Sequence, residues 1–412
     1  MSAFLKRQLI QLGFAANGLR PLPGSPASVP AFFSGWLTVE LAPHLLALTA
    51  ADAAWHAARG ARTRRTAAGL LVAGANATAY TTMIARGRRA AGEIEDALVE
   101  ALGAGYREAI KRDPLPDDVS APWQSLALPF RMRDISVTRK RRLAYAPGGR
   151  RYELDVLHHR DSPPDAPVLL QVHGGGWVMG NKEWEGNQLM LHMAARGWVC
   201  VAVNYPLSPR ARWPEHIVAV KRAVRWIREN IAEYGADPSF IAVSGGSAGG
   251  HLAAMTALTA NDPALQPGFE DVDTSIQACA SFYGVYDFTD ESGERYTRQR
   301  LNSLLRPYVM SRSATYPDDY RAASPLYRVS AEAPPFLVLH GTNDTLVPVA
   351  DGRAFVDRLR AQAKNPVAYA ELAGAQHAFD VFPSLRSSAV VRGVARFLEW
   401  CHATRDERPV AG

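Results

Sequence analysis

A serine in this chain lies in a pattern that could support acyl transfer. Ser247 stands in the segment SGGSAGGHLAAM, where Gly245 and Gly249 give the spacing G-x-S-x-G. An apolar run precedes the segment and a helix-forming run follows it, so we expect the serine on a sharp turn between a strand and a helix. Side chains two residues before and two residues after the serine would clash across such a turn, which explains the two glycines. The helix N-terminus behind the serine favours developing negative charge.

A serine hydroxyl is a weak nucleophile, so it needs a base, and the base needs an orienting carboxylate. Asp344 follows the apolar run PPFLVLH, and His377 follows the run VAYAEL. For a serine on this kind of turn, the partners come in the order Ser, Asp or Glu, His, each on a loop after a later strand. We therefore predict that Ser247 is the nucleophile, His377 the base and Asp344 the carboxylate.

Other acids and histidines compete for these roles. Asp351 and Asp380 are interpreted as helix-start or surface acids, and Asp287 follows an earlier strand. His340 closes a strand and is interpreted as a structural hydrogen-bonding residue, while His251 lies one turn into the helix after the serine. The prediction therefore favours Asp344 and His377 over these competing residues.

A second glycine-rich segment, His173-Gly174-Gly175-Gly176, follows the apolar run VLLQV. A run of glycines lets a carbonyl oxygen approach bare peptide N–H groups, which is what a tetrahedral oxyanion requires. We predict that this loop and the N–H group of Ala248, the residue after the serine, form an oxyanion hole. A flexible glycine loop without a catalytic role is the alternative interpretation.

The elements that must hold these loops are predicted from apolar runs that alternate with helical patterns. The runs expected to form buried strands are residues 168–172, 199–204, 240–243, 276–282, 336–340 and 367–372. One helix face is marked by Ile217, Val220, Val224, Ile227 and Ile231. Apolar strands that alternate with helices predict a parallel sheet covered on both faces. Before these runs, residues 131–138 and 151–159 flank the turn sequence APGGR and are expected to pair as strands.

The first 125 residues differ from the rest. Two apolar stretches, residues 29–54 and 67–85, are separated by the basic segment RGARTRR. The second is near the length that crosses a bilayer, but it consists mostly of Ala, Gly and Thr, with Asn76 in its middle. Interfacial or cap-forming helices and a membrane hairpin both remain open. Residues 112–123, with three prolines and paired acids, are expected to form a linker.

The composition limits the remaining partners. The 46 basic residues exceed the 40 acidic ones, but no basic run is interleaved with aromatics, so we expect no nucleic-acid partner. The surplus fits a solvated arginine-rich surface, with an anionic membrane as the main rival. Three scattered cysteines, Cys200, Cys279 and Cys401, argue against a disulfide framework and against a zinc site. The N-terminus lacks a secretory signal pattern, so we expect a cytoplasmic location, with membrane contact through residues 1–110 as an open alternative.

Five motifs resemble those of the hormone-sensitive-lipase family of bacterial esterases and lipases: HGGGWVMG, VNYPLSPRARWPEH, GGSAGGHLAA, HGTNDTLVP and GAQHAF. The resemblance implies an α/β-hydrolase fold, with a mostly parallel eight-stranded sheet and helices on both faces. The resemblance covers about residues 130–405. Together with the change of pattern along the chain, it predicts a catalytic domain over residues 126–405, an extra helical cap or membrane-associated region with its linker over residues 1–125, and a tail over residues 406–412. The chain departs from common family residues at Pro206, Gly246 and Ala378.

The resemblance also implies roles for individual residues. These are Ser247, Asp344 and His377 as the triad, the N–H groups of Gly175, Gly176 and Ala248 as the oxyanion hole, and His173 as the residue that orients the glycine loop. In this family the N-terminal helices cover the acyl site, so the apolar stretches are expected to serve as a lid.

We therefore expect a serine carboxylesterase or lipase that hydrolyses short- to medium-chain acyl esters through an acyl-enzyme intermediate. The expected partner is a small-molecule ester, and we expect neither a metal ion nor an organic cofactor. An arylformamidase-like amidase is an alternative because it would share the serine turn and the triad. A non-catalytic, membrane-tethered binding protein is a second alternative. The physiological substrate, the acyl-chain length and the oligomeric state stay open.

Overall fold

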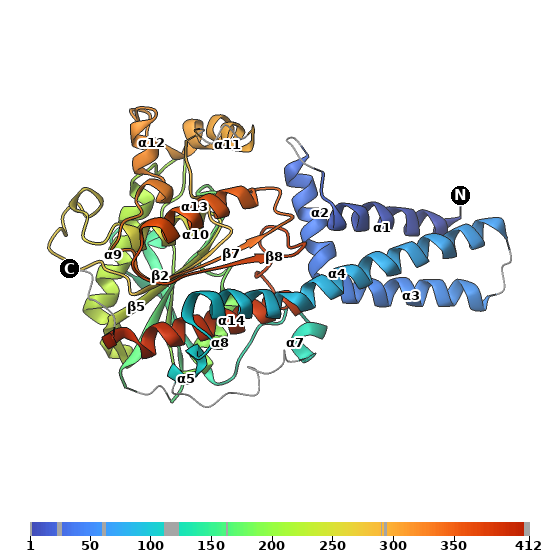
Figure 1. Cartoon of the computed structure of the whole chain (residues 1–412), viewed down its shortest axis with the longest axis horizontal. Helices are drawn as coiled ribbons and strands as arrows, with labels where there is room; N and C mark the ends of the chain where they lie inside the picture. Colours follow the sequence, from blue (N-terminus) through green and yellow to red (C-terminus); the bar gives the residue numbers. More distant parts are fainter. Residues whose placement is uncertain are drawn as a thin grey trace.

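The computed structural model describes residues 2–22, 27–59, 63–110, 123–161, 164–289, 291 and 295–407. An eight-stranded sheet forms the centre of the larger part of the molecule, and N-terminal helices extend from one side of it (Figure 1). The strands are β1 (Val137–Ala144), β2 (Glu153–His159), β3 (Ala166–Val172), β4 (Val199–Val203), β5 (Ala236–Gly246), β6 (Ala278–Phe282), β7 (Phe336–Gly341) and β8 (Val367–Leu372).

The strand order is β1-β2-β4-β3-β5-β6-β7-β8. Strand β2 is antiparallel to β1 and to β4, and the strands from β4 to β8 along this order are parallel to one another. This arrangement confirms the predicted fold class. Each of the six predicted buried runs contains one of the strands β3 to β8 or its central part.

The first predicted strand was placed too early in the chain. Residues 131–136 precede β1, which begins at Val137. The Asp134 carboxylate accepts hydrogen bonds from the backbone N–H and the hydroxyl of Ser136, at 2.8 and 2.6 Å. Such a side-chain turn takes the backbone donor away from a strand ladder, so pairing with β2 starts only after it.

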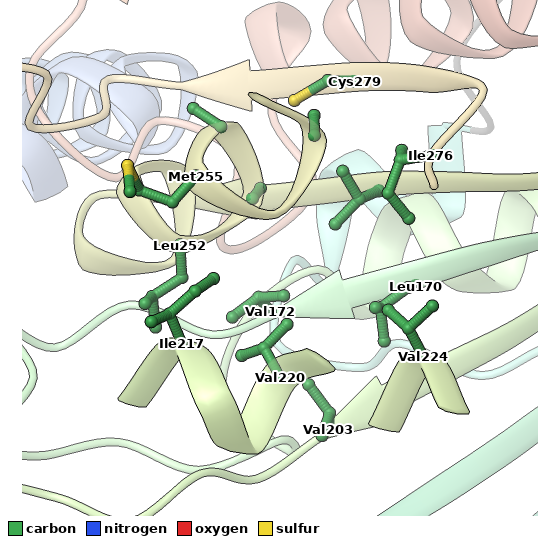
Figure 2. Packing of buried hydrophobic residues seen from close by; sticks show 14 of the residues in the cluster. Leu170, Val172, Val203, Ile217, Val220, Val224, Leu252, Met255, Ile276 and Cys279 are labelled. Atoms are coloured by element: carbon green, nitrogen blue, oxygen red, sulfur yellow. The ribbon is translucent and has the colours of Figure 1, made fainter. Parts of the chain in front are cut away.

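Helices cover both faces of the sheet. One core contains α9 (Glu215–Asn230), α10 (Ala248–Leu258) and α13 (Val349–Gln362), and the opposite core contains α8 (Asn187–Ala195) and α14 (Leu385–Ala403). Along β3, Leu170 belongs to the first core and Leu169 to the second, as the alternation of a strand requires. Figure 2 shows Val224 of α9 close to Leu170 and Val220 close to Val172. Full burial of each such side chain contributes about 1.5–3 kcal/mol.

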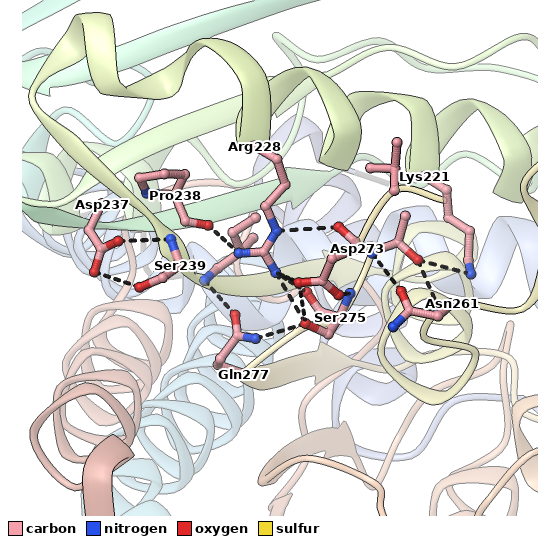
Figure 3. Close-up of polar contacts among 12 residues, drawn as sticks. Lys221, Arg228, Asp237, Pro238, Ser239, Asn261, Asp273, Ser275 and Gln277 are labelled. Atoms are coloured by element: carbon pink, nitrogen blue, oxygen red, sulfur yellow. Dashed lines mark hydrogen bonds and ion pairs between the residues drawn. The ribbon is translucent and has the colours of Figure 1, made fainter. Parts of the chain in front are cut away.

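Polar contacts of Arg228 attach α9 to the neighbouring segments of the chain. Arg228 on α9 donates to the carbonyls of Pro238 and Ser275, and it pairs with Asp273 at 3.1 Å (Figure 3). The guanidinium therefore joins the helix to the start of β5 and to the segment before β6. Its planar set of five donors suits this role.

The N-terminal region contains α1 (Ala3–Leu19), α2 (Ser28–Glu40), α3 (Ala42–Ala58) and α4 (Arg64–Leu102). The predicted stretch 29–54 is divided between α2 and α3, with a bend of 77°. The stretch 67–85 lies within α4, where Asn76 is buried and donates to Gln8 of α1 at 3.0 Å. Within the described residues, no single helix is long and apolar enough to cross a membrane, and α2 with α3 passes that test only as a bent pair.

Helix α4 belongs to both parts of the molecule. Its first half packs with α1 and α3 around Tyr80 and Met83, and its second half places Ala90 and Ile94 in the core beside α14. At 39 residues it is about 58 Å long. Figure 1 shows it leading from the far tip of the N-terminal helices to the sheet.

The remaining elements are short. They are α5 (Tyr106–Ala109), α7 (Trp123–Ala127), α11 (Arg295–Arg300), the π-helical segment η4 (Leu301–Val309), α12 (Asp318–Ala322) and the turns η1 (Gly149–Tyr152), η2 (Ile231–Tyr234), η3 (Pro263–Leu265), η5 (Pro325–Tyr327) and η6 (Arg405–Glu407). Of the predicted linker 112–123, only Trp123 is within the described residues, and residues 408–412 of the predicted tail lie outside them.

Candidate active site

Ser247 lies on the turn between β5 and α10, where the spacing predicts it. Its backbone is in the left-handed region, with φ 58° and ψ −122°. That conformation costs a non-glycine residue about 1–3 kcal/mol, so the surroundings must hold it. The Ser247 N–H donates to the carbonyl of Phe282, and its own carbonyl accepts from the N–H of His251, both at 3.0 Å. A Cβ atom at Gly245 would clash with the backbone of Gly249, as expected for this turn.

Asp344 and His377 lie on the loops after β7 and β8 and are hydrogen-bonded to each other. His377 Nδ1 is 2.6 Å from Asp344 Oδ2. Asp344 Oδ1 accepts from the N–H groups of Leu346 and Val347 at 2.9 and 2.8 Å. The Asp344 side chain is fully buried, and the His377 side chain is 5% exposed. Every carboxylate oxygen of Asp344 thus has a donor, which fixes its orientation.

The charge state of Asp344 follows from its neighbours. Burial alone would raise its pKa, but His377 and His340 outweigh burial through charge and hydrogen bonding and hold the pKa well below its usual range. His340 Nε2 is 3.5 Å from Asp344 Oδ2 and 2.9 Å from the carbonyl of Val347. The expected hydrogen-bonding role of His340 is therefore confirmed, with Asp344 beside it.

Tyr283 links the surroundings of the serine to those of the histidine. Its ring centroid is 4.4 Å from that of His377. A Cβ atom at Gly246, the residue before Ser247, would be 2.6 Å from Tyr283 Oη. The loops after β5, β7 and β8 follow parallel strands and so emerge at the same edge of the sheet. The structure therefore brings the three predicted residues to one edge.

The glycine loop after β3 lies against the serine turn. A Cβ atom at Gly174 would be 2.8 Å from the carbonyl oxygen of Gly246. Gly175 and Gly176 have φ angles of 105° and 59°, which other residues rarely adopt. Ala248 is the first residue of α10, where backbone N–H groups have no partner within the helix. The predicted oxyanion donors therefore come from two touching segments.

His173 is held at the start of the glycine loop. Its Nδ1 atom is 2.7 Å from the carbonyl oxygen of Gly174, and its ring stacks on Tyr205 with centroids 4.4 Å apart. Burial lowers the pKa of His173 to about 4. A neutral ring with these contacts fits the predicted role in orienting the loop.

Glu185 and Asp380 add an acidic pair beside this loop. Glu185 accepts from the N–H of Gly174 at 2.7 Å, and burial followed by the charge of Asp380 raises its pKa to about 7. Asp380 accepts a short hydrogen bond from the hydroxyl of Tyr283, and burial raises its pKa. The interpretation of Asp380 as a helix-start or surface acid is therefore wrong, because the chain after His377 folds back onto Tyr283.

The other competing residues have structural contacts. Asp351 lies in the first turn of α13, as expected, and pairs with Arg300 at 2.7 Å. His251 Nε2 is 2.8 Å from the carbonyl oxygen of Ala323. Asp287 accepts from the N–H of Thr289 at 2.7 Å.

Tyr283 and Glu185 are among the site residues that the sequence does not reveal. Tyr283 has a φ of 36°, and no sequence pattern indicates a left-handed tyrosine. Glu185 stands in the polar segment NKEWEGN, which resembles an ordinary surface loop. The one available signal was the proximity of that segment to the glycine loop in the chain. Within the described ranges, no group of three or more His, Cys, Asp or Glu side chains is arranged to hold a metal ion.

The N-terminal helices reach the same edge. The Phe32 ring of α2 meets the His377 ring edge-on, with centroids 5.9 Å apart. The Thr345 hydroxyl, next to Asp344, donates to the carbonyl of Ser28 at 3.0 Å. The predicted cap therefore touches the acid and base loops directly.

A sheet of this order with a serine on the turn after β5 defines the α/β-hydrolase class. The BD-FAE family model matches residues 154–359. The "Probable carboxylic ester hydrolase LipM" of Mycobacterium tuberculosis is 41% identical over 395 residues, covering 94% of this chain and 91% of that protein. Esterase LipQ of the same organism is 46% identical over 314 residues, covering 74% and 73%.

Among solved structures, the apo form of Thermogutta terrifontis esterase 2 matches with a TM-score of 0.51 and 26% identity, covering 64% of this chain and 92% of that one. The chain belongs to the BD-FAE family, within the hormone-sensitive-lipase-like hydrolases that its motifs predict, and it is a carboxylic ester hydrolase. The alignment with LipM covers 94% of the chain and so includes most of the N-terminal helices.

Proposed function

We propose that the enzyme hydrolyses short- to medium-chain acyl esters through an acyl-enzyme on Ser247, with His377 as base and Asp344 as its carboxylate. The observation that carries this proposal is the 2.6 Å hydrogen bond between His377 Nδ1 and Asp344 Oδ2, at the sheet edge where the serine turn lies. With Nδ1 turned to the carboxylate, Nε2 is the ring nitrogen that can accept the proton of the serine hydroxyl.

The reaction then follows in two halves. Ser247 Oγ attacks the ester carbonyl carbon while His377 takes the hydroxyl proton, and the alcohol leaves with that proton as the acyl-enzyme forms. Water attacks the acyl group next, His377 takes its proton, and Ser247 regains a proton as the acid departs. The backbone N–H groups of Gly175, Gly176 and Ala248 are the donors for the oxyanion in both halves.

An apolar acyl group fits the side chains at this edge. Leu304 of η4 lies against the glycine loop, since a Cβ atom at Gly176 would be 3.8 Å from its Cδ2. Phe32 of α2 lies against the base. Burial of acyl methylenes against such side chains contributes about 0.8 kcal/mol each.

The test is the variant Ser247→Ala. We expect kcat for p-nitrophenyl butyrate to fall by roughly 10⁶-fold, because the triad acts as one unit. The exposed Ser313→Ala is the matched control and should keep full activity. Unchanged turnover in Ser247→Ala would contradict the assignment. Faster hydrolysis of an aryl formamide than of the ester by the native enzyme would favour an amidase instead.

We also propose that the far tip of the N-terminal helices contacts an anionic membrane surface. Trp55 of α3 and Leu71 of α4 are 56% and 77% exposed. The Arg59 guanidinium lies 4.0 Å from the Trp55 ring centroid, and Arg64 and Arg65 are exposed at the start of α4. Tryptophan with arginine is typical of helices that lie in a membrane interface.

Vesicle sedimentation tests this contact without disturbing the catalytic edge. The double variant Trp55→Ser, Leu71→Ser should bind phosphatidylserine-containing vesicles several-fold more weakly than the native chain while hydrolysing a water-soluble ester at the native rate. Ile135→Ser removes an equally exposed apolar side chain from outside the N-terminal helices and is the control. Equal sedimentation of all three proteins would contradict the proposal.

A further inference from the structure

Gln376 directly precedes the base and has no part in the chemistry proposed above. Its side chain is buried, with 1% exposed. Its Oε1 atom accepts hydrogen bonds from two backbone donors, the N–H of Thr345 at 2.8 Å and the N–H of His377 at 2.9 Å. One side-chain oxygen therefore joins the residue after Asp344 to the base itself.

This junction bears on the acid–base pair because the pair spans two loops. Asp344 and His377 are 33 positions apart, and their 2.6 Å hydrogen bond requires the two loop backbones to keep a fixed separation. Gln376 Oε1 holds one N–H from each backbone at a single point. Displacement of a reacting group by about 1 Å can cost 10²-fold in rate, so such a junction has kinetic consequences.

The N-terminal helices close the other side of the junction. A Cβ atom at Gly35 of α2 would be 3.1 Å from Asn17 Nδ2 and 3.5 Å from Gln376 Nε2, so α2 packs directly beside the amide. The side chain of Asn343 donates to the carbonyl of Gly18, at the end of α1, at 3.1 Å. These contacts join positions more than three hundred residues apart in the chain.

We propose that Gln376 is a positioning residue that keeps the Asp344 and His377 loops in register, and that α2 holds it in place. This inference rests on the proposed function, since it takes Asp344 and His377 as carboxylate and base. The N-terminal helices are then part of the framework of the active site and not only a cover over it.

Gln376→Met tests the junction, because methionine fills a similar volume without the acceptor oxygen. We expect kcat for p-nitrophenyl butyrate to fall 10- to 100-fold with KM changed less than threefold. We also expect the downfield proton resonance of His377 Nδ1, which reports its hydrogen bond to Asp344, to shift or broaden. Gln362→Met, at an exposed position at the end of α13, is the matched control and should change neither.

Two further variants keep the proposal open to refutation. Gln376→Glu retains an acceptor oxygen, so its kcat should be at least threefold higher than that of Gln376→Met. If Gln376→Met does not fold, Gly35→Val crowds both Asn17 and the Gln376 amide from the side of α2 and should lower kcat without a matching change in KM. A kcat within twofold of the native value, together with an unchanged resonance in the folded variant, would overturn the proposal.

Failure of the proposed function would look different. A native chain that hydrolysed no ester would contradict the esterase mechanism. The Nδ1 resonance would still show whether Gln376 holds the two loops together.

Discussion

The serine and its two predicted partners reach the same edge of the sheet by different means. Ser247 is held mainly within its own turn, through the close approach of Gly245 and Gly249 and the start of α10, with one hydrogen bond to Phe282 of β6. The acid loop is also held by distant residues, with hydrogen bonds from Asn343 to Gly18 and from Thr345 to Ser28. A turn that is strained locally leaves a pattern in the sequence, whereas a tertiary support does not.

The comparison predicts which changes act on the chemistry alone and which act through the N-terminal helices. Variants of the serine turn should abolish activity and leave those helices in place. Variants that remove the hydrogen bonds between the acid loop and the N-terminal helices should lower activity and also weaken the packing of those helices. The four predictions below run from the largest expected effect to the smallest.

Gly249→Ala should have the largest effect, because the added Cβ would clash with the carbonyl of Val172 and lie 2.7 Å from that of His173. We expect kcat/KM to fall by roughly 10²–10³-fold, since the turn and the adjacent N–H of Ala248 would both shift. Initial rates with p-nitrophenyl butyrate measure this. Gly74→Ala, an open position on α4, is the control. Activity within threefold of the native value would show that the turn tolerates a side chain.

Glu40→Gln should cause the next largest effect, through stability. Glu40 of α2 pairs with Arg386 at the start of α14, and the two side chains are 2% and 1% exposed. The change leaves a buried guanidinium without its counter-charge, so we expect a loss of about 3–5 kcal/mol in the free energy of unfolding. Urea denaturation measures it. Glu229→Gln breaks an exposed pair with Arg225 and should change stability far less. Equal losses would mean that the Glu40 pair is solvated.

The double variant Asn343→Ala, Thr345→Val removes two ties between the acid loop and the N-terminal helices. We expect kcat to fall by about 10-fold, less than for the serine turn, because Asp344 keeps its backbone donors Leu346 and Val347. Steady-state kinetics with a soluble ester provide the measurement. Thr78→Val, exposed on α4, is the control. An unchanged kcat would mean that contacts within the hydrolase part alone hold the acid loop in position.

The smallest effect concerns pH and Glu185. An unfolded glutamate has a pKa of about 4.3, whereas burial and Asp380 raise the pKa of Glu185 to about 7. A raised pKa means that the folded state binds the proton more tightly, so this stability is fully present below about pH 4 and is lost as pH rises through about 7. Because Glu185 is partly exposed, we expect a loss of only about 1–2 kcal/mol between pH 5 and 8.

Urea denaturation of the native chain and Glu185→Gln at both pH values tests this prediction. The variant keeps an acceptor for the N–H of Gly174, and its free energy of unfolding should lack the pH dependence that Glu185 contributes. The prediction would be contradicted if the difference in free energy of unfolding between the native chain and the variant were the same at pH 5 and pH 8.

Much of the hydrolase part could be predicted because its information is local. Strands β3 to β8 are short apolar runs, and Ser247 sits where glycine spacing and a strand-to-helix change coincide. The N-terminal helices were predicted less well, since the apolar stretch 29–54 contains no pattern that sets its break between α2 and α3. Pro43 fits the first turn of α3, but a helix-start proline does not fix the 77° bend.

The residues that surround the predicted triad could not be inferred for a related reason. Tyr283, Glu185 and Asp380 acquire their roles from contacts across the sheet edge, and their sequence neighbours look ordinary. Gln376 looks like a spacer before the histidine until its oxygen is seen to bridge two loops. Positions of this kind need a fold before they can be recognised.

The uninterrupted course of α4 has a mechanical consequence. Because this helix of about 58 Å packs at one end in the core beside α14 and at the other in the cluster with α1 and α3, its outer end cannot rotate independently of the sheet. A surface that contacts the outer end of α4 would therefore lie at a fixed orientation relative to the active site. For the proposed membrane contact, this would set the orientation of the active site through the fold itself and not through a flexible tether.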